Sequence, residues 1–378
     1  MRIALLTRSY PADGDLYKYP FVHRRVKAYV AAGHDVRVLR LGEVQGSHLF
    51  DGIECRTVNA ARFAGEVAAF APDVIAAHGP DDVQWPALMA LQGRWPICAW
   101  LHGSEIPGIQ RVKASLVTDP EERAVAEALT ERRAAFWRGT LADWPAALWL
   151  AFPSHNAALL MRQDIGAGVG EGRMAVLPNP IDTDLFRTRD KQAEDALHVL
   201  SIRPHDSWLY ANDLAVQAVL HLQAHPRFAE MRFTFIGDGP LFDETFAPVR
   251  HLPNVNVRRT FLRQEEIARE HARHGVFLVP SRLDTQGVSR DEAMASGLAP
   301  VTTRVFAVPE FVDGNCAGLV EPEDAAGLAS EIARMVDDPT LFLARSRAAA
   351  ARVRAQSAHD HVIPRELAWM QGAVDAAR

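Results

Sequence analysis

Short apolar runs alternate with segments of helical periodicity along almost the whole chain of 378 residues. In the first half the strand candidates are residues 3–7, 35–41, 53–58, 73–77, 97–101, 148–152 and 174–177. Several of these runs are apolar throughout, which is typical of strands buried on both faces of a parallel sheet. Because amphipathic helical segments separate them, the alternation predicts repeated βα units and an α/β fold.

The second half repeats the pattern, with strand candidates at 197–202, 232–236, 255–257, 276–279, 300–303 and 318–320. A chain of this length is about two and a half times a typical domain of ~150 residues. Pro178, Pro180 and a charged stretch interrupt the periodicity before Ala196. We therefore expect two doubly wound, Rossmann-like domains, 1–183 and 184–360. A C-terminal helix, 361–378, follows, and packing against the first domain is one option for it.

Composition excludes several classes of protein. Hydrophobic residues make up 48% and charged residues 23% of the chain, which are ordinary globular values. The net charge of -6 disfavours a dedicated nucleic-acid binder. The longest apolar run, residues 146–152, is far shorter than the ~18 to 20 residues of a membrane helix. The first residues are typical of a strand, and not of a signal peptide. We expect a soluble cytoplasmic protein, with peripheral contact at the inner face of a membrane left open.

The cysteines and the lysines are both informative. Cys55, Cys98 and Cys316 are widely separated and form no CxxC pair, so neither a disulfide framework nor a zinc site is indicated. Only four of the 41 basic residues are lysines, and the last of them is Lys191. Any fixed cation in a binding site of the second half must therefore be an arginine.

Residues 279–297 carry the clearest chemical signal. A buried strand ends at Pro280, a polar loop containing Gly287 follows, and a helix begins near Val288. Ligands of open α/β sheets bind outside the carboxyl ends of the strands, and a helix N-terminus attracts anions. We therefore expect a phosphate beside residues 287–289. Asp284 and Glu292 flank this position, and carboxylates are suited to accept hydrogen bonds from sugar hydroxyls.

The same segment resembles the acidic-x7-Glu motif of the retaining GT-B glycosyltransferases, family 4 or group 1 type. Further matches occur in the expected order at residues 101–105, 179–182, 201–203, 235–239, 292–297, 300–302 and 308–314. The resemblance covers nearly the whole second half and scattered points of the first. It implies the GT-B architecture, in which two Rossmann-like domains face each other across a cleft.

The resemblance also implies roles for individual residues. Glu292 would bind ribose hydroxyls, and the backbone amides of Gly287, Val288 and Ser289 would bind a diphosphate. Three residues would be catalytic. His102 would lie near the transferred sugar, Asp284 would bind the hydroxyls of that sugar, and Arg203 would neutralise the departing diphosphate. The remaining candidates for donor binding are Gln286, Arg282, Gly237 and Phe261.

The implied activity is transfer of a sugar, with retention, from a nucleoside-diphosphate sugar to a hydroxyl of a glycan or lipid-linked glycan. The resemblance suggests the bacterial envelope as the destination. It implies no metal and no cofactor. A catalytically weak or inactive nucleotide-sugar-binding protein is the alternative. A nucleotide-sugar epimerase or glycosyl phosphorylase would need an acid/base pair or a phosphate or cofactor pocket of its own, and the sequence shows no such dedicated set.

Two departures from the family pattern bear on activity. The family usually has glutamate where Asp284 stands, and it commonly has a lysine a few residues after the arginine at Arg203. Residues 204–214 contain no lysine. Because one cation would leave a diphosphate under-neutralised, we expect a second arginine at the site. Arg282 is favoured, and Arg259, Arg263 and Arg290 are less favoured.

Three other patterns have a simpler interpretation than a ligand site. The Asp-x-Asp triplets at 13–15 and 182–184 are more typical of turns and caps than of a metal site. Gly166, Gly168 and Gly170 follow a helical segment, which favours a helix-to-strand connection over a dinucleotide site. Six tryptophans lie between residues 85 and 149, and burial is their commonest use. Stacking on sugars and anchoring at a bilayer stay open for these tryptophans.

Overall fold

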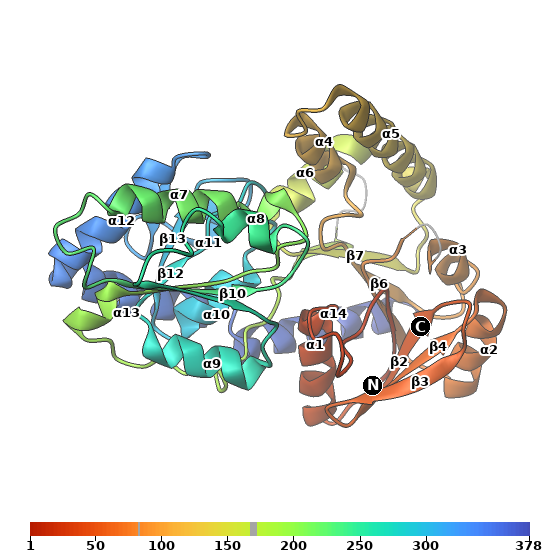
Figure 1. The fold of residues 1–378 in the computed structure, drawn as a ribbon. Coiled ribbons are helices and arrows are strands. Elements are labelled where there is room, and N and C mark those ends of the chain that lie inside the picture. Colours follow the sequence, from red (N-terminus) through yellow and green to blue (C-terminus); the bar gives the residue numbers. More distant parts are fainter. Residues whose placement is uncertain (82–83, 167–171) are drawn as a thin grey trace. The chain divides into compact units, whose positions relative to one another are not determined.

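The computed structural model describes residues 1–81, 84–166 and 172–378, and its contacts divide the chain into two compact units (Figure 1). Unit 1 comprises Met1–Pro180 together with Val362–Arg378, and unit 2 comprises Ile181–His361. The divisions therefore lie after residues 180 and 361, where the sequence predicted 183 and 360. Gly168 and Gly170 lie outside the described residues.

Among the described residues, the sheet of unit 1 has eight strands in the order β3-β4-β2-β1-β5-β6-β7-β8. They are β1 (Arg2–Thr7), β2 (Asp35–Leu41), β3 (Gly46–Phe50), β4 (Ile53–Val58), β5 (Val74–His78), β6 (Ile97–Trp100), β7 (Leu148–Phe152) and β8 (Met174–Val176). Neighbouring strands are parallel except β3 and β4. The seven predicted strands are confirmed, and β3 was missed. It joins β4 through Asp51 and Gly52, which both have left-handed backbones.

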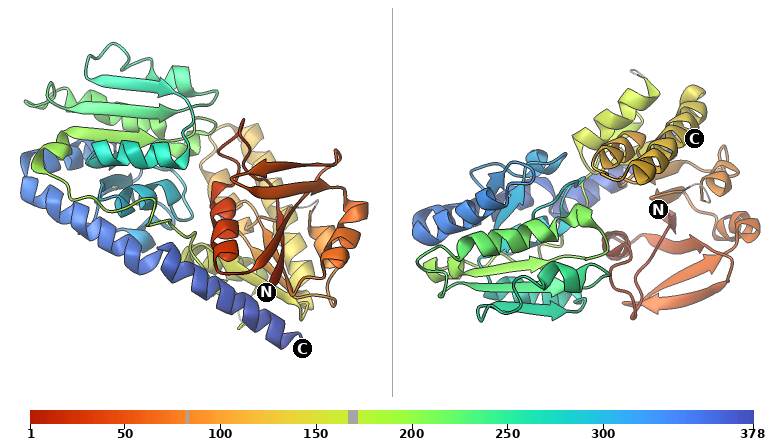
Figure 2. Two further views of the ribbon diagram at one scale, coloured as in Figure 1. Left: turned by 90° about the horizontal axis from the view of Figure 1, so that it is seen from below. Right: turned by 45° about the horizontal axis from the view of Figure 1, so that its top comes forward.

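Six helices of unit 1 lie between its described strands in the sequence, and a seventh, α14, comes from the C-terminal part of the chain. They are α1 (Pro20–Ala31), α2 (Ala60–Phe70), α3 (Gln84–Met89), α4 (Pro107–Ser115), α5 (Pro120–Ala142), α6 (His155–Ile165) and most of α14 (His359–Ala376). Helices α4, α5 and α6 lie side by side (Figure 2, right). Asp119 caps α5 by accepting hydrogen bonds from the backbone of Glu121 and Glu122.

Helix α14 completes the core of unit 1. Met370, Ala373 and Val374 belong to the same buried cluster as residues of β1 and β2. Glu366 of this helix is fully buried and forms an ion pair with Arg25 of α1, at 2.9 Å. The hydroxyl of Tyr29 donates a second hydrogen bond to Glu366, at 2.5 Å. The two ends of the chain are therefore joined inside unit 1 by a buried polar cluster.

The sheet of unit 2 has six parallel strands among the described residues, in the order β11-β10-β9-β12-β13-β14. They are β9 (His198–Ile202), β10 (Arg232–Gly237), β11 (Val255–Arg259), β12 (Val276–Leu278), β13 (Ala299–Thr303) and β14 (Gly318–Val320). Strands β10 and β11 extend the sheet on one side of β9, and strands β12 to β14 extend it on the other. The strand order therefore reverses between β9 and β12, where ligands of open α/β sheets bind.

Helices cover both faces of this sheet. They are α7 (Asn212–Leu222), α8 (Phe242–Phe246), α9 (Gln264–Arg273), α10 (Val288–Ala295), α11 (Val308–Phe311), α12 (Ala325–Asp337) and α13 (Pro339–Gln356). Helices α7 and α12 pack side by side (Figure 1). Val199 lies in a core cluster with α7 and α12, whereas its neighbour Leu200 lies in a cluster with α10. Consecutive residues of β9 thus face opposite layers, and the prediction of two doubly wound sheets is confirmed.

The structure shows where the apolar segments, the cysteines and the tryptophans of the chain lie. Among the described residues, no helix is both long enough and apolar enough to span a membrane. The three cysteines are free and buried. Three tryptophans of the 85–149 group, Trp85, Trp100 and Trp137, are buried, and the other three are partly buried. Contacts with other residues of the protein therefore bury much of the surface of these tryptophans.

Candidate active site

The loops that follow β9 and β12 meet through Arg203 and Ser281. Arg203 comes directly after β9, and its Nη2 donates a hydrogen bond to the Ser281 hydroxyl at 2.7 Å. The guanidinium also lies over the ring of Tyr210, with Cζ 4.8 Å from the ring centroid. Because β9 and β12 flank the reversal of strand order, these contacts place a cation at the expected ligand position of the sheet.

Arg203 is unusual in its charge environment. It is 5% exposed, and among the described residues its hydrogen-bond partners are the uncharged Ser281, Ser289 and Pro280. Burial lowers the pKa of Arg203 below its ordinary value, and the charge of Asp284 partly opposes this shift. A buried cation without an ion-paired carboxylate is costly, and a bound anion would offset that cost.

The loop before α10 requires glycine at position 287. Gly287 caps the helix with a left-handed backbone (φ 99°), and a Cβ there would lie 2.8 Å from the guanidinium of Arg290. The first backbone N–H groups of α10, which include those of Val288 and Ser289, have no carbonyl partner within the helix. This helix end follows the strand that neighbours β9, so it lies on the Arg203 side of the sheet.

A buried network supports this loop from within. Arg290 donates hydrogen bonds to the Gln286 carbonyl at 2.5 Å and to Asp291 at 2.7 Å. The side-chain amide of Gln286 donates to Asp291 at 3.1 Å. Burial raises the pKa of Asp291, and Arg290 opposes the shift. The Gln286 side chain, predicted to bind a donor, is almost fully buried and contributes to the shape of the loop.

The two acidic residues of the motif differ in environment. Asp284 is half-buried and accepts a hydrogen bond from the backbone of Gln286 at 3.1 Å. Glu292 is buried in the second turn of α10. One carboxylate thus shapes the loop before the helix, and the other lies within the helix.

His102 belongs to unit 1 and follows β6, the strand that ends at Trp100. Its Nε2 lies 3.2 Å from Nδ1 of His78, at the end of β5. Its backbone N–H donates to Glu105 at 3.0 Å, and so does that of Gly103. The carboxylate of Glu105 thereby fixes the turn that carries His102 at the carboxyl edge of this sheet.

Comparison with known proteins shows what the chain is similar to. Residues 199–338 match the family model described as Glycosyl transferases group 1. The sulfoquinovosyl transferase of Arabidopsis thaliana is 25% identical over 286 residues, which cover 73% of this chain and 52% of that relative. The aligned part thus spans about half the length of the curated relative.

The chain resembles the group 1 glycosyltransferases.

Solved structures share the complete fold. Sucrose-phosphate synthase from Thermosynechococcus elongatus superposes with a TM-score of 0.77 at 15% identity and covers 100% of both chains. Anabaena HepE, solved in complex with UDP and glucose, superposes with a TM-score of 0.70 at 14% identity over 98% of this chain and 100% of that one. The group 1 resemblance therefore includes the GT-B fold.

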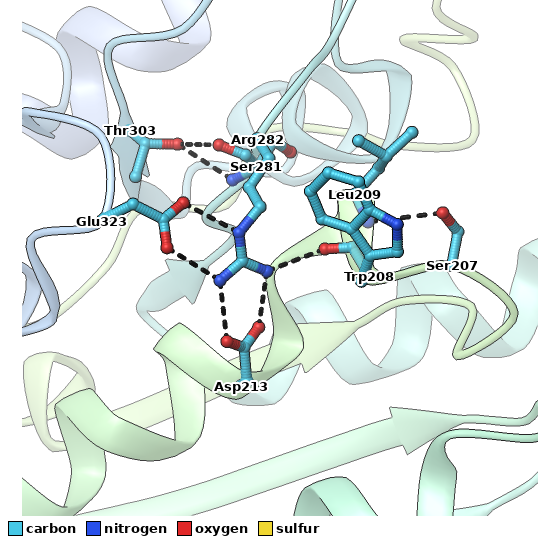
Figure 3. Close-up of polar contacts among 8 residues, drawn as sticks. All are labelled: Ser207, Trp208, Leu209, Asp213, Ser281, Arg282, Thr303 and Glu323. Atoms are coloured by element: carbon cyan, nitrogen blue, oxygen red, sulfur yellow. Dashed lines mark hydrogen bonds and ion pairs between the residues drawn. The ribbon is translucent and has the colours of Figure 1, made fainter. Parts of the chain in front are cut away.

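Arg282 has a different role from the one predicted as a substitute for the lysine of group 1 glycosyltransferases. Its guanidinium donates to both carboxylate oxygens of Asp213, to both of Glu323 and to the Trp208 carbonyl, all at 2.7 to 2.8 Å (Figure 3). These five contacts use the five N–H donors of the side chain. Arg282 therefore ties together the segments after β9, β12 and β14, and it has no donor left for a diphosphate.

Two of the three less favoured arginines, Arg290 and Arg259, also have carboxylate partners. Arg290 pairs with Asp291, and Arg259 pairs with Asp238 at 2.7 Å and with Asp243 at 2.6 Å. Arg203 thus differs from Arg282, Arg290 and Arg259 in having no ion-paired carboxylate among the described residues. Of these four arginines, Arg203 alone is an uncompensated cation among the described residues, and it lies where the strand order reverses between β9 and β12, which we call the switch point of unit 2.

Gly237 and Phe261 complete the predicted set. A Cβ on Gly237 would lie 1.9 Å from the Arg203 carbonyl oxygen, so this glycine allows the end of β10 to approach the Arg203 backbone. Phe261 is half-buried in the loop after β11, where the Thr260 hydroxyl donates to its carbonyl. Binding of the nucleotide-sugar donor stays a prediction for both residues. The close approach of two backbones already explains why position 237 is a glycine.

The Asp182-Thr183-Asp184 triplet lies in a turn. Asp182 accepts hydrogen bonds from the backbone of Asp184 and Leu185, which is the capping role that the sequence favoured. His359 offers a third possible ligand atom near the two carboxylates. Because backbone capping explains the position of Asp182, the triplet carries no metal assignment, and metal-free chemistry stays a prediction.

Sequence reasoning missed four residues of these two sites: Ser281, Tyr210, Arg290 as a support of the loop, and His78. Ser281 directly follows the strand end at Pro280, so its position alone was a usable signal. His78 ends an apolar run in the same way. Tyr210 lies in a short 3₁₀ turn after β9, and no local pattern points to its contact with Arg203.

Proposed function

We propose that this protein is a metal-independent, retaining glycosyltransferase that transfers a sugar from a nucleoside-diphosphate sugar to an acceptor hydroxyl. The observation that carries the proposal is Arg203 at the switch point of unit 2, a buried cation to which no described carboxylate is ion-paired. The resemblance to group 1 glycosyltransferases, including a sulfoquinovosyl transferase, supports the reaction class. UDP is the first nucleotide to test, because HepE was solved with it.

In this proposal unit 2 binds the donor. The amides at the start of α10 and the Arg203 guanidinium bind the diphosphate, Glu292 accepts hydrogen bonds from ribose hydroxyls, and Asp284 accepts them from the transferred sugar. In unit 1, His102 contacts a sugar hydroxyl. We propose a glycan or lipid-linked glycan of the bacterial envelope as the acceptor class.

The reaction breaks the bond between the anomeric carbon and the β-phosphate oxygen and forms a bond from that carbon to the acceptor oxygen on the same face. The acceptor hydroxyl transfers its proton to the departing phosphate. Negative charge grows on that phosphate while positive character grows on the sugar. Preorganised donors such as Arg203 and the helix amides stabilise the phosphate charge in the transition state, which lowers the barrier.

A nucleotide-sugar-binding protein of low or no activity is the second candidate. It is favoured by the ion pairs of Arg282, Arg290 and Arg259, which leave Arg203 to neutralise a diphosphate that carries more than one charge. The two candidates differ in turnover and not in binding.

The test begins with thermal unfolding in the presence of UDP, GDP, dTDP and ADP, since a bound nucleotide raises the apparent stability. We expect one nucleotide to raise the midpoint for the wild-type protein and not for Glu292→Gln. Arg227→Ala is the matched control, because Arg227 pairs with Glu230 away from the switch point. Slow release of nucleoside diphosphate from the matching nucleotide sugar supports the transferase, and binding without release supports the second candidate. A shift that persists in Glu292→Gln would contradict the donor site.

A further inference from the structure

Among the described residues, Trp208 is the one Phe, Tyr or Trp that is exposed, at 38% of its full surface. It starts the short 3₁₀ turn Trp208–Tyr210, which follows β9. The ring of Tyr210, at the end of this turn, lies under the guanidinium of Arg203. A single exposed apolar side chain is ordinary on a protein surface. The support and the position of Trp208 are what distinguish it.

Hydrogen bonds fix the backbone of this turn. The carbonyl of Trp208 accepts a hydrogen bond from Nη1 of Arg282 at 2.8 Å, and the carbonyl of Leu209 accepts one from the backbone N–H of Arg282 at 2.9 Å. The hydroxyl oxygen of Ser207 accepts a third, from the backbone N–H of Leu209, at 3.3 Å. The protein itself therefore sets the orientation of the Trp208 backbone before a ligand binds.

A cation supports the indole ring. Cζ of Arg282 lies 5.7 Å from the centroid of the Trp208 ring (Figure 3). The positive guanidinium is attracted by the π electrons of the ring. Ion pairs with Asp213 and Glu323 hold the guanidinium in place. A flat apolar surface that is held in this way loses little conformational freedom when a ligand packs on it.

Trp208 also lies beside groups of the candidate site. Arg282, which contacts its ring, directly follows Ser281, and the Ser281 hydroxyl accepts a hydrogen bond from Arg203 at 2.7 Å. Asp284 comes two residues after Arg282. Arg282 thus joins the turn that exposes Trp208 to the loop that carries Asp284. The indole therefore borders the position at which a ligand of Arg203 and Asp284 would lie.

The chemistry of indole selects one part of a nucleotide sugar. An uncharged ring does not neutralise a phosphate. A pyranose ring has an apolar face of C–H groups, which packs on an aromatic surface while the hydroxyls at its rim form hydrogen bonds. A nucleobase also stacks on aromatic rings. The proposed function, however, assigns ribose to Glu292, ten residues after Arg282, and the transferred sugar to Asp284. The position of Trp208 thus favours the sugar.

We propose that Trp208 is a specificity-determining residue whose indole stacks on the apolar face of a pyranose ring. This inference rests on the function proposed above and adds a sugar contact to it. The pyranose is the transferred sugar of the donor or a sugar unit of the acceptor, since both offer the same kind of C–H face. The experiment has one arm for each source.

The donor arm is a calorimetric titration of the full-length protein with UDP, GDP, dTDP and ADP and with their glucose and mannose conjugates. Trp208→Leu keeps an apolar side chain and removes the ring. If the stacked sugar belongs to the donor, we expect the Kd of the nucleotide sugar to rise roughly tenfold in this variant, with the Kd of the nucleoside diphosphate unchanged. Trp208→Phe keeps a flat ring and should restore most of the affinity. An equal rise for both ligands would assign the indole to the nucleotide and overturn the proposal.

The acceptor arm uses maltotriose and cellotriose as probes, with and without the nucleoside diphosphate. Saturation-transfer difference NMR identifies the ring protons of these glycans that lie against the protein. If the stacked sugar belongs to the acceptor, we expect saturation of the C–H protons of one pyranose face by the wild-type protein and by Trp208→Phe, and not by Trp208→Leu. A lack of any sugar contact that depends on Trp208 in both arms would overturn the proposal.

Trp95→Leu is the matched control. Trp95 also lies under an arginine, with Cζ of Arg94 4.6 Å from its ring centroid, but it precedes β6 at the amino edge of the sheet of unit 1. We expect this variant to bind every probe as the wild-type protein does. Because Trp208 is exposed, Trp208→Leu should fold, and thermal unfolding checks this.

Two further outcomes separate the proposal from its alternatives. If Trp208→Leu is less stable but binds every sugar like the wild-type protein, the indole only covers Arg282, and the proposal is wrong. If the wild-type protein binds no nucleotide and no nucleotide sugar, the proposed function fails, while the oligosaccharide arm still decides whether Trp208 contacts a sugar.

Discussion

The guanidinium of Arg282 donates two parallel hydrogen bonds to the carboxylate of Asp213, at 2.8 and 2.7 Å. Glu323 receives a second pair on another edge of the same guanidinium, at 2.8 Å for each bond. This arrangement satisfies the side chain completely within the protein. It makes Arg282 a structural cross-link between the segments that follow β9, β12 and β14.

Arg282→Ala is therefore expected to reduce stability and not ligand binding. Loss of the charge-assisted bonds should lower the free energy of unfolding by about 1 to 3 kcal/mol, because the two carboxylates are partly exposed and regain water. Thermal unfolding measures this loss, and the stabilising effect of the nucleotide should persist. A lost nucleotide effect at unchanged stability would instead support the diphosphate role that the sequence predicted.

Replacing Arg203 should weaken ligand binding and not stability, the reverse of what we expect for Arg282. Arg203→Met keeps most of the side-chain volume and removes a buried charge that is ion-paired to no carboxylate in the described part of the chain. We expect the unfolding midpoint of the free protein to stay the same or to rise, since a buried charge costs free energy. Nucleotide binding should weaken, and kcat should fall by roughly 10² to 10³. A strongly destabilised variant that still binds nucleotide would assign Arg203 to the fold alone.

A substitution at Gly237 tests whether β10 approaches the Arg203 backbone closely. A Cβ at this position would lie 1.9 Å from a carbonyl oxygen, so Gly237→Ala must move the backbone. We expect a loss of about 2 to 4 kcal/mol in the free energy of unfolding, measured by denaturant titration. Gly314→Ala is the control in the same unit, because nothing lies within 4 Å of a Cβ there. Equal stability of the two variants would contradict the predicted steric conflict.

Acid should weaken unit 2 partly through His205. Burial, with a contribution from Arg203, lowers the pKa of His205 from 6.5 to about 4. The unfolded chain therefore binds a proton at higher pH than the folded chain does. His205 is neutral in both states above pH 6.5, and its contribution to stability is lost as the pH falls from 6.5 toward 4. Denaturant titrations at several pH values should show a smaller acid-dependent loss for His205→Gln. Titration of His205 near pH 6.5 in the folded protein would refute this.

The fold was largely predictable because buried parallel strands are continuous apolar runs, and such runs can be recognised locally. Strand β3 was missed because it is an exposed edge strand with no apolar alternation in Gly46–Phe50. A signal for it was present: Asp51-Gly52 is a dipeptide that favours a tight hairpin turn, and it stands directly between β3 and β4.

The candidate site was predictable where its residues lie close together in sequence. Asp284, Gly287 and Glu292 come from one strand-loop-helix unit, so the motif determines their spacing. Arg282 lies in the same unit, but its partners Asp213 and Glu323 are 69 and 41 residues away. The charge environment of an arginine depends on such distant partners, and local patterns do not reveal them.

The buried pair of Arg25 and Glu366 also constrains the order of assembly during synthesis. Unit 2 is one continuous segment, Ile181–His361, whereas unit 1 needs residues 362–378 to complete its core. On a ribosome, Arg25 emerges 341 residues before its carboxylate partner. The N-terminal unit is thus translated first and completed last, which reverses the usual order in which domains finish folding.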